Sequence, residues 1–171
     1  SNPAVVNGRL LFKATKNSIG NELFCSDGTD TGTYMVKDIY PGITGSLVNE
    51  IIEANGIGFF YAQDPVSGKE LWRSDGTSGG TYMIMDFNTG SGSSGSSSII
   101  EFNNLCLIGA YKPEIGTELW LSDGSAIGTT LVRDIAAGSK SADVHNITPT
   151  DSLIFLSTTD YTNGNAVFRS D

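Results

Sequence analysis

Short apolar runs separated by turn residues follow one another along the whole chain. The first such run recurs at residues 9–14, 57–62, 105–110 and 153–158. These runs are rich in β-branched and aromatic residues, and no stretch shows a sustained helical period. Asn-Gly pairs at Asn7-Gly8 and Asn55-Gly56 are typical of tight hairpin turns. The pattern therefore predicts strands throughout, and an all-β fold class.

A seven-residue segment repeats in register with these predicted strands. It reads Leu71-Trp72-Arg73-Ser74-Asp75-Gly76-Thr77 near the middle of the chain, and related copies begin at Leu23, Leu119 and Val167. The serines of the four copies lie at 26, 74, 122 and 170, so each step is 48 residues (74−26, 122−74, 170−122). A repeat of about this period is typical of propellers and related arrays.

Each 48-residue unit contains four predicted strands, the content of one β-propeller blade. We treat residues 1–171 as a single repeat domain, and list its parts as the end of a preceding unit (1–6), full units 7–54, 55–102 and 103–150, and a partial unit 151–171. Three architectures fit: a closed small propeller whose N-terminal strand completes the last blade, a slice of a longer array, and a β-trefoil. The incipient fourth unit favours a propeller, because a trefoil has three units.

The repeated segment resembles the ELWxxDGT repeat family. Glu70 to Thr77, Gly80-Thr81 and Asp86 match its pattern, and so do Glu118 to Gly124 in the next copy. The first copy has Phe24 in place of the tryptophan. The resemblance implies propeller-type arrays in large secreted or surface-attached bacterial proteins. It implies an extracellular or cell-surface location and a binding or structural role, and it supplies no catalytic residues.

Composition narrows the range of partners. The net charge is −9 and the pI near 4.4, which disfavours nucleic acid and anionic membrane surfaces. No apolar run has the length of a transmembrane helix, so we expect no membrane insertion. Cys25 and Cys106 lie at different repeat positions, and we expect no disulfide between them.

Two ladders of aspartates repeat with the 48-residue period. They are Asp27, Asp75 and Asp123, and Asp38, Asp86 and Asp134. An aspartate before glycine accepts backbone N–H groups in a turn, so we expect both ladders to fasten turns. For Asp27, Asp75 and Asp123 the alternative is calcium binding, because these oxygens lie in Gly-rich loops of an acidic chain. Repetition in every copy disfavours catalysis, which needs one asymmetric constellation.

Large aromatic residues and glutamates also keep the repeat. The aromatic positions are Phe24, Trp72, Trp120 and Phe168. We expect these rings to wedge between neighbouring blades. The glutamates are Glu22, Glu70 and Glu118, with Ala166 in the fourth copy. We expect them to pair with Lys or Arg on a neighbouring blade.

Function is expected where the copies differ. The loops between the first and second strands of each unit vary most, and they should lie together on one rim. Tyr111 and Tyr161 are the candidate ligand contacts there. We expect a non-enzymatic module without a required cofactor, whose partner is a protein, a glycan, or further copies of itself in an oligomer or filament. The alternatives are a calcium-stabilised scaffold and a glycan-processing enzyme, for which the four arginines suggest no cluster.

Overall fold

The structure of the protein is a computed structural model, and it describes residues 2–142, 144–150, 153–160 and 164–170. Fifteen strands form four antiparallel sheets in these residues, and no described residue is in a helix. The all-β class predicted from the apolar runs is therefore confirmed. Within the described residues no helix has the length and apolar character needed to cross a bilayer.

The first two sheets each contain four strands that follow chain order. Sheet A consists of β1 (Ala4–Val6), β2 (Arg9–Lys16), β3 (Gly20–Ser26) and β4 (Tyr34–Lys37). Sheet B consists of β5 (Ile52–Ala54), β6 (Ile57–Asp64), β7 (Gly68–Ser74) and β8 (Tyr82–Met85). Both are simple antiparallel meanders, so every strand pairs with its neighbour in sequence.

Sheet C repeats this arrangement, and sheet D has three strands in the same order among the described residues. Sheet C consists of β9 (Gly95–Phe102), β10 (Leu105–Lys112), β11 (Gly116–Ser122) and β12 (Thr130–Arg133). Sheet D consists of β13 (His145–Pro149), β14 (Ile154–Asp160) and β15 (Gly164–Ser170). The pairing register is the same in each copy: Phe12 faces Phe24, Phe60 faces Trp72, and Ile108 faces Trp120.

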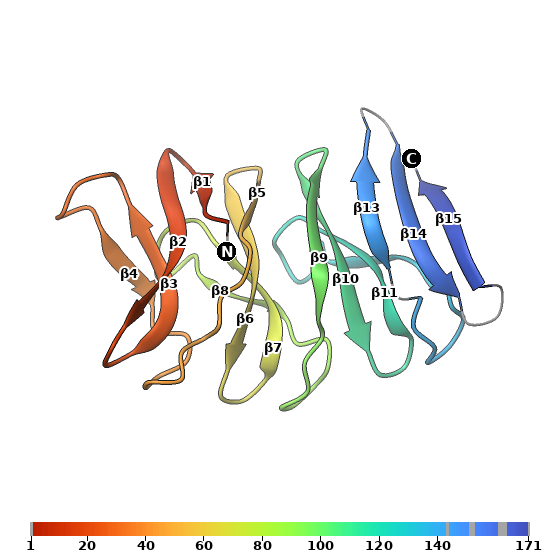
Figure 1. The fold of residues 1–171 in the computed structure, drawn as a ribbon, viewed down its shortest axis with the longest axis horizontal. Helices are drawn as coiled ribbons and strands as arrows, with labels where there is room; N and C mark the ends of the chain where they lie inside the picture. Colours follow the sequence, from red (N-terminus) through yellow and green to blue (C-terminus); the bar gives the residue numbers. More distant parts are fainter. Residues whose placement is uncertain (1, 143, 151–152, 161–163, 171) are drawn as a thin grey trace.

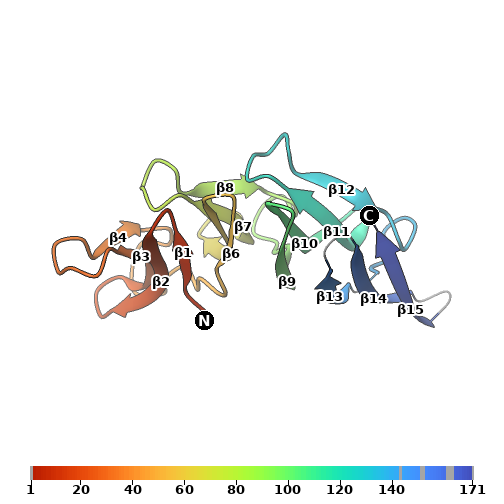
Figure 2. The ribbon, with the colours of Figure 1, turned by 90° about the horizontal axis from the view of Figure 1, so that it is seen from above.

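The four sheets lie in a row, in the order of the chain (Figure 1). The first strands of successive sheets are neighbours, because β1 contacts β5, β5 contacts β9, and β9 contacts β13. Turned by 90°, the molecule shows the last strands β8 and β12 along one side of the row, and β9 and β13 along the other (Figure 2). Each sheet therefore packs face to face against the next.

The sheets are out of phase with the units 7–54, 55–102 and 103–150. Residues 52–54, at the end of a sequence unit, pair with the strand that opens the following unit. In the same way β1 pairs with β2, and so belongs to sheet A. The closed arrangement in which the N-terminal strand completes the last blade is therefore wrong. The apolar pattern locates these short strands but carries no information on which neighbour they pair with.

Three apolar clusters fill the spaces between consecutive sheets. Phe60 and Trp72 of sheet B lie with residues of sheet A in the first cluster, and Trp120 of sheet C lies with residues of sheet B in the second. Phe168 packs, partly buried, against the third cluster between sheets C and D. Phe24 is half-buried, and its ring centroid lies 6.0 Å from that of Phe12. The rings of Trp72, Trp120 and Phe168 point toward the preceding sheet. Phe24 occupies the equivalent position in the first sheet.

Both cysteines are free and buried in the clusters. Burial raises the pKa of the Cys106 thiol, so this group stays neutral. The two residues act as small apolar side chains.

Candidate functional site

The Ser-Asp-Gly-Thr segment between the third and fourth strands of a sheet closes a dense turn. In sheet A, Thr29 donates its backbone N–H and its hydroxyl to Asp27 Oδ1, at 3.0 and 2.7 Å. Gly32 N then donates to Thr29 Oγ1 at 2.9 Å, and Thr33 Oγ1 donates to Thr29 O at 2.7 Å. Because the Thr33 proton is used there, Ser26 Oγ donates to Thr33 Oγ1 at 2.6 Å. One carboxylate oxygen thus anchors the whole turn.

The same network is present in the next two sheets. Thr77 N and Oγ1 donate to Asp75 Oδ1 at 2.8 and 2.7 Å. Ser125 N and Oγ donate to Asp123 Oδ1 at the same two distances. The hydrogen bonds from Thr29 and Ser125 hold the pKa of Asp27 and Asp123 below its usual value. These carboxylates are therefore ionised turn anchors at neutral pH.

The described residues contain no group of three or more His, Cys, Asp or Glu side chains placed to hold a metal ion. Asp27, Asp75 and Asp123 lie in the turns of three different sheets, so they do not form one common ligand set. Calcium binding requires six to eight oxygen ligands, and in each turn Oδ1 of the aspartate already accepts two hydrogen bonds. Calcium binding at these turns stays an untested alternative to their role as turn anchors.

The second aspartate ladder lies just after the last strand of each sheet. Asp38 and Asp134 are exposed, and Asp134 Oδ2 accepts the N–H of Gly138 at 3.3 Å. Asp86 is half-buried, and its Oδ1 is buried without a hydrogen-bond partner among the described residues. Each of the three aspartates lies near the buried glutamate of its own sheet. Their hydrogen bonds differ from one sheet to the next.

Glu22, Glu70 and Glu118 are fully buried, and each clasps the long loop that leaves its sheet. Glu22 accepts the N–H groups of Ile39 (3.0 Å), Tyr40 (3.1 Å) and Ser46 (3.0 Å). It also accepts the Ser46 hydroxyl at 2.7 Å. The prediction that these glutamates form ion pairs with a neighbouring sheet is wrong. Their partners are the backbone and a serine of their own loop.

The clasp recurs with small variations in the next two sheets. Glu70 accepts the N–H groups of Phe87 and Ser94, and the Ser94 hydroxyl as well. Glu118 accepts the N–H of Ile135 at 2.8 Å, while Ala142 stands where the other copies have serine. A glutamate at the start of a strand with a serine 24 residues later is the sequence signal for this clasp. It is visible in two of the three copies (46−22, 94−70).

Burial dominates the titration of these glutamates. It raises the pKa of Glu70 to about 7, although hydrogen bonds from Ser94 and Phe87 oppose the shift and Asp86 adds to it. Burial likewise raises the pKa of Glu22 and of Glu118. A carboxyl group with a raised pKa can mark an active site, yet this one is enclosed by its own loop. We therefore assign these residues to structure.

The variable loops lie along one edge of the row, the edge that holds the β2–β3, β6–β7 and β10–β11 hairpin turns in Figure 1. Tyr111 is half-buried near the end of β10, and its N–H donates to Ser94 O at 3.1 Å. Tyr161 lies outside the described residues. The long loops pass beneath these turns: a side chain at Gly20, Gly68 or Gly116 would collide with the loop backbone. We call this edge the hairpin rim.

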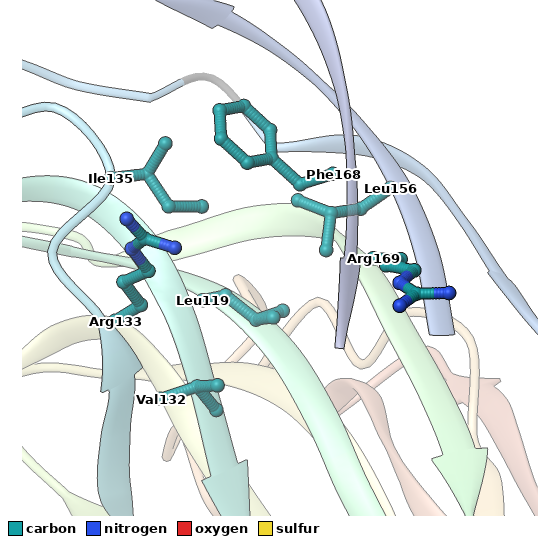
Figure 3. A pocket seen from close by; sticks show the side chains of 7 residues that line it. All are labelled: Leu119, Val132, Arg133, Ile135, Leu156, Phe168 and Arg169. Atoms are coloured by element: carbon teal, nitrogen blue, oxygen red, sulfur yellow. The ribbon is translucent and has the colours of Figure 1, made fainter. Parts of the chain in front are cut away.

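A cavity of about 100 Å³ opens between sheets C and D. Its walls come from β11, β12, β14 and β15, and include Arg133, Phe168 and Arg169. Figure 3 shows the two arginines on opposite sides of the view, with Leu119 and Leu156 between them. Sequence reasoning did not expect two of the four arginines at one cavity. The described lining residues carry no carboxylate, hydroxyl or thiol, so they supply no nucleophile or general base.

A more open cavity of about 510 Å³ lies across the first strands of three sheets. Ile52, Ile99 and Ile147 line it together with Glu50 and Glu101. Glu50 accepts a hydrogen bond from Asn2 Nδ2 at 3.0 Å. The lining combines apolar isoleucines with two acidic side chains, which suits a neutral or basic ligand.

The chain was compared with known proteins. No protein-family model matches it, and a search of curated proteins finds no significant match. The resemblance to ELWxxDGT repeats therefore stays a prediction that is based on the repeated motif.

Proposed function

We propose that the protein is a non-enzymatic, extracellular or cell-surface module of β-propeller type, which binds a protein or glycan partner or assembles with copies of itself. One observation carries the proposal. The polar side chains that repeat most strictly already make hydrogen bonds within the fold: Asp75 anchors a turn and Glu70 clasps a loop. Recognition is then left to the surfaces where the copies differ.

The propeller architecture is supported by the sheets themselves. Four separate meanders lie side by side, and their first strands contact one another in sequence. In a β-trefoil, three units share one barrel, whereas the strand pairing here stays within each sheet. Blades of four antiparallel strands packed face to face are the elements from which propellers are built.

The extracellular location rests on the motif resemblance alone. A non-enzymatic role fits the cavity between sheets C and D, since its described lining residues supply neither a nucleophile nor a general base. We place partner binding on the hairpin rim, where loops of different sequence stand on a rigid framework.

A binding screen tests this proposal. The chain would be applied to a glycan array and to a panel of extracellular proteins, and each hit would be measured by surface plasmon resonance. Tyr111→Ala should weaken a genuine rim contact at least about tenfold. Tyr82→Ala, on the last strand of sheet B, is the matched control and should leave binding unchanged. An empty screen, or equal binding by both variants, would contradict binding at the rim.

A further inference from the structure

We propose that a second copy of this chain packs head to tail on the first, through the two sheet faces at opposite ends of the row. The inference deepens the proposed assembly role and rests on it. Its basis is that the chain already forms the same interface three times internally. The two end faces are equivalent to the two halves of such an interface, and no sheet of the described residues covers them.

Each internal interface joins two kinds of sheet face. What we call the trailing face points toward the next sheet, and in sheet A it carries Leu11 and Leu23. The leading face points toward the preceding sheet, and in sheet B it carries Phe60 and Trp72. All four side chains are buried in one cluster. Sheets B and C, and then C and D, meet through the equivalent positions in the other two clusters.

The trailing face of sheet D has no sheet packed against it in the described chain. Phe155 and Val167 occupy the positions of Leu11 and Leu23, each 144 residues earlier (155−11, 167−23). Leu11 and Leu23 are 0% exposed, whereas Phe155 is 39% and Val167 is 76% exposed. Two positions of the repeat whose apolar side chains are buried at every internal interface are therefore open to solvent in sheet D.

The leading face of sheet A is open in the same way. Phe12 and Phe24 are half-buried, while Phe60 and Trp72 at the equivalent positions are 0% and 6% exposed. Leu10 on the same face is 39% exposed. Its equivalent in sheet B, Gly58, lies so close to sheet A that a side chain there would begin 2.9 Å from Leu11. By this equivalence Leu10 of one copy meets Phe155 of the other.

Charge favours the same pairing. At the interface of sheets B and C, a side chain at Gly124 would begin 3.3 Å from Arg73 Nη1. The Arg73 guanidinium thus sits over the turn that holds Asp123, and it adds to the lowered pKa of that aspartate, which is mainly due to Ser125. Arg169 occupies the position of Arg73, and Asp27 that of Asp123 (169−73, 123−27). Head-to-tail packing brings Arg169 of one copy to Asp27 of the next.

The faces are different surfaces, so the contact is heterologous. A heterologous contact repeats until a ring closes or a filament grows, whereas two identical patches would stop at a dimer. The second copy supplies the same packing that stabilises the internal interfaces. It also covers the apolar side chains that each end exposes.

The test is sedimentation velocity of the full chain over a concentration series up to about 100 µM. The wild-type chain should form species larger than a dimer. Val167→Glu and Leu10→Glu each spoil one face and should each weaken association at least about tenfold. Both positions are exposed in the single chain, so folding should survive, and circular dichroism checks this. Val66→Glu is the matched control, because Val66 is 74% exposed on a hairpin turn away from both faces.

Mixing the two variants gives the decisive result. Each variant keeps one intact face, so an equimolar mixture should form a heterodimer and nothing larger. A monomeric wild-type chain, or a mixture that stays monomeric, would overturn the proposal. Association that survives both substitutions would overturn it as well. Tyr111→Ala should leave the sedimentation unchanged, so the failure of rim binding and the failure of head-to-tail packing are separate outcomes.

Discussion

The glutamates that clasp the long loops are buried carboxyl groups, and burial raises the pKa of each. A carboxylate in a protein interior is stable only where hydrogen bonds replace its hydration. Glu70 accepts two backbone N–H groups and a hydroxyl, yet burial still raises its pKa to about 7. The folded protein therefore holds a proton on Glu70 at a pH where the unfolded chain has released it.

This linkage predicts a fall in stability as the pH rises. The unfolded pKa of Glu70 is the ordinary 4.5 and the folded pKa is about 7. The stabilisation from proton binding is therefore complete below about pH 4.5 and lost above about pH 7. Urea unfolding at pH 5 and pH 7.5 should show the decrease, and Glu70→Gln should reduce it. An equal decrease in the variant would show that Glu70 does not cause it.

At the acid end the turn aspartates have the opposite effect. Hydrogen bonds from Thr29 lower the pKa of Asp27, and those from Ser125 lower the pKa of Asp123. Their stabilisation is present above the unfolded pKa of 3.8 and is lost as the pH falls below it. Together with the glutamates, they place the stability optimum on the acid side of neutrality.

The glycine that follows each turn is needed for space. A side chain at Gly80 would collide with the Asp75 carboxylate, whereas a side chain at the adjacent Gly79 would meet no atom within 4 Å. Moving Asp75 aside would break its hydrogen bonds with Thr77. Gly80→Ala should therefore destabilise the fold by about 1–3 kcal/mol. Gly79→Ala is the control in the same denaturation experiment and should be near neutral; equal losses would contradict the packing argument.

At the scale of elements, the aromatic side chains between the sheets contribute much of the stability of each interface. Trp72 lies between sheets A and B, and its indole Nε1 makes no hydrogen bond with the described residues. Trp72→Ala should cost about 3–5 kcal/mol, as for other large buried aromatic residues. Trp72→Phe should be much milder, because Phe24 fills the same position in sheet A. Phe24→Ala should cost clearly less than Trp72→Ala, since Phe24 is only half-buried. Thermal unfolding of the three variants measures this order.

The strands could be predicted largely from the local apolar pattern, but their pairing into sheets could not. The apolar runs located β2, β6, β10 and β14, because strand residues repeat with the 48-residue period. The short runs at residues 52 and 147 gave no hint of pairing forward into the next unit. That choice depends on contacts with a following strand, which a single run does not encode. Glu22 was misread for the same reason, since its partners Ile39 and Ser46 lie far along the chain.

The candidate sites show the same limit. The repeat correctly separated loops that vary from positions that persist, and the hairpin turns do lie along one edge. That Arg133 and Arg169 both border one cavity was not predictable from spacing. It follows from the packing of sheet D on sheet C, because β12 and β15 belong to different sheets.

At the scale of the whole molecule, the row of sheets is held by repeated packing and by hydrogen bonds between neighbouring sheets. Tyr34 Oη donates to Gly76 O at 2.9 Å, and Tyr61 Oη donates to Gly109 O at the same distance. Lys37 Nζ donates to Thr81 O at 2.6 Å. Because each interface is similar, stability should grow with the number of interfaces, as in other repeat proteins.

Calcium would be a second way to stiffen such an array, and its role can be measured directly. A ligand that binds only the folded state must raise the thermal midpoint with its concentration. In the three turns Oδ1 of the aspartate is already bonded, as Asp75 is to Thr77, so we expect the midpoint to be the same with millimolar calcium and with a chelator. Asp75→Asn is the companion variant, and it should lower the midpoint equally in both buffers because it weakens the turn itself. A midpoint that rises with calcium in the wild-type chain and less in Asp75→Asn would instead establish the calcium-stabilised scaffold, with these turns as its sites.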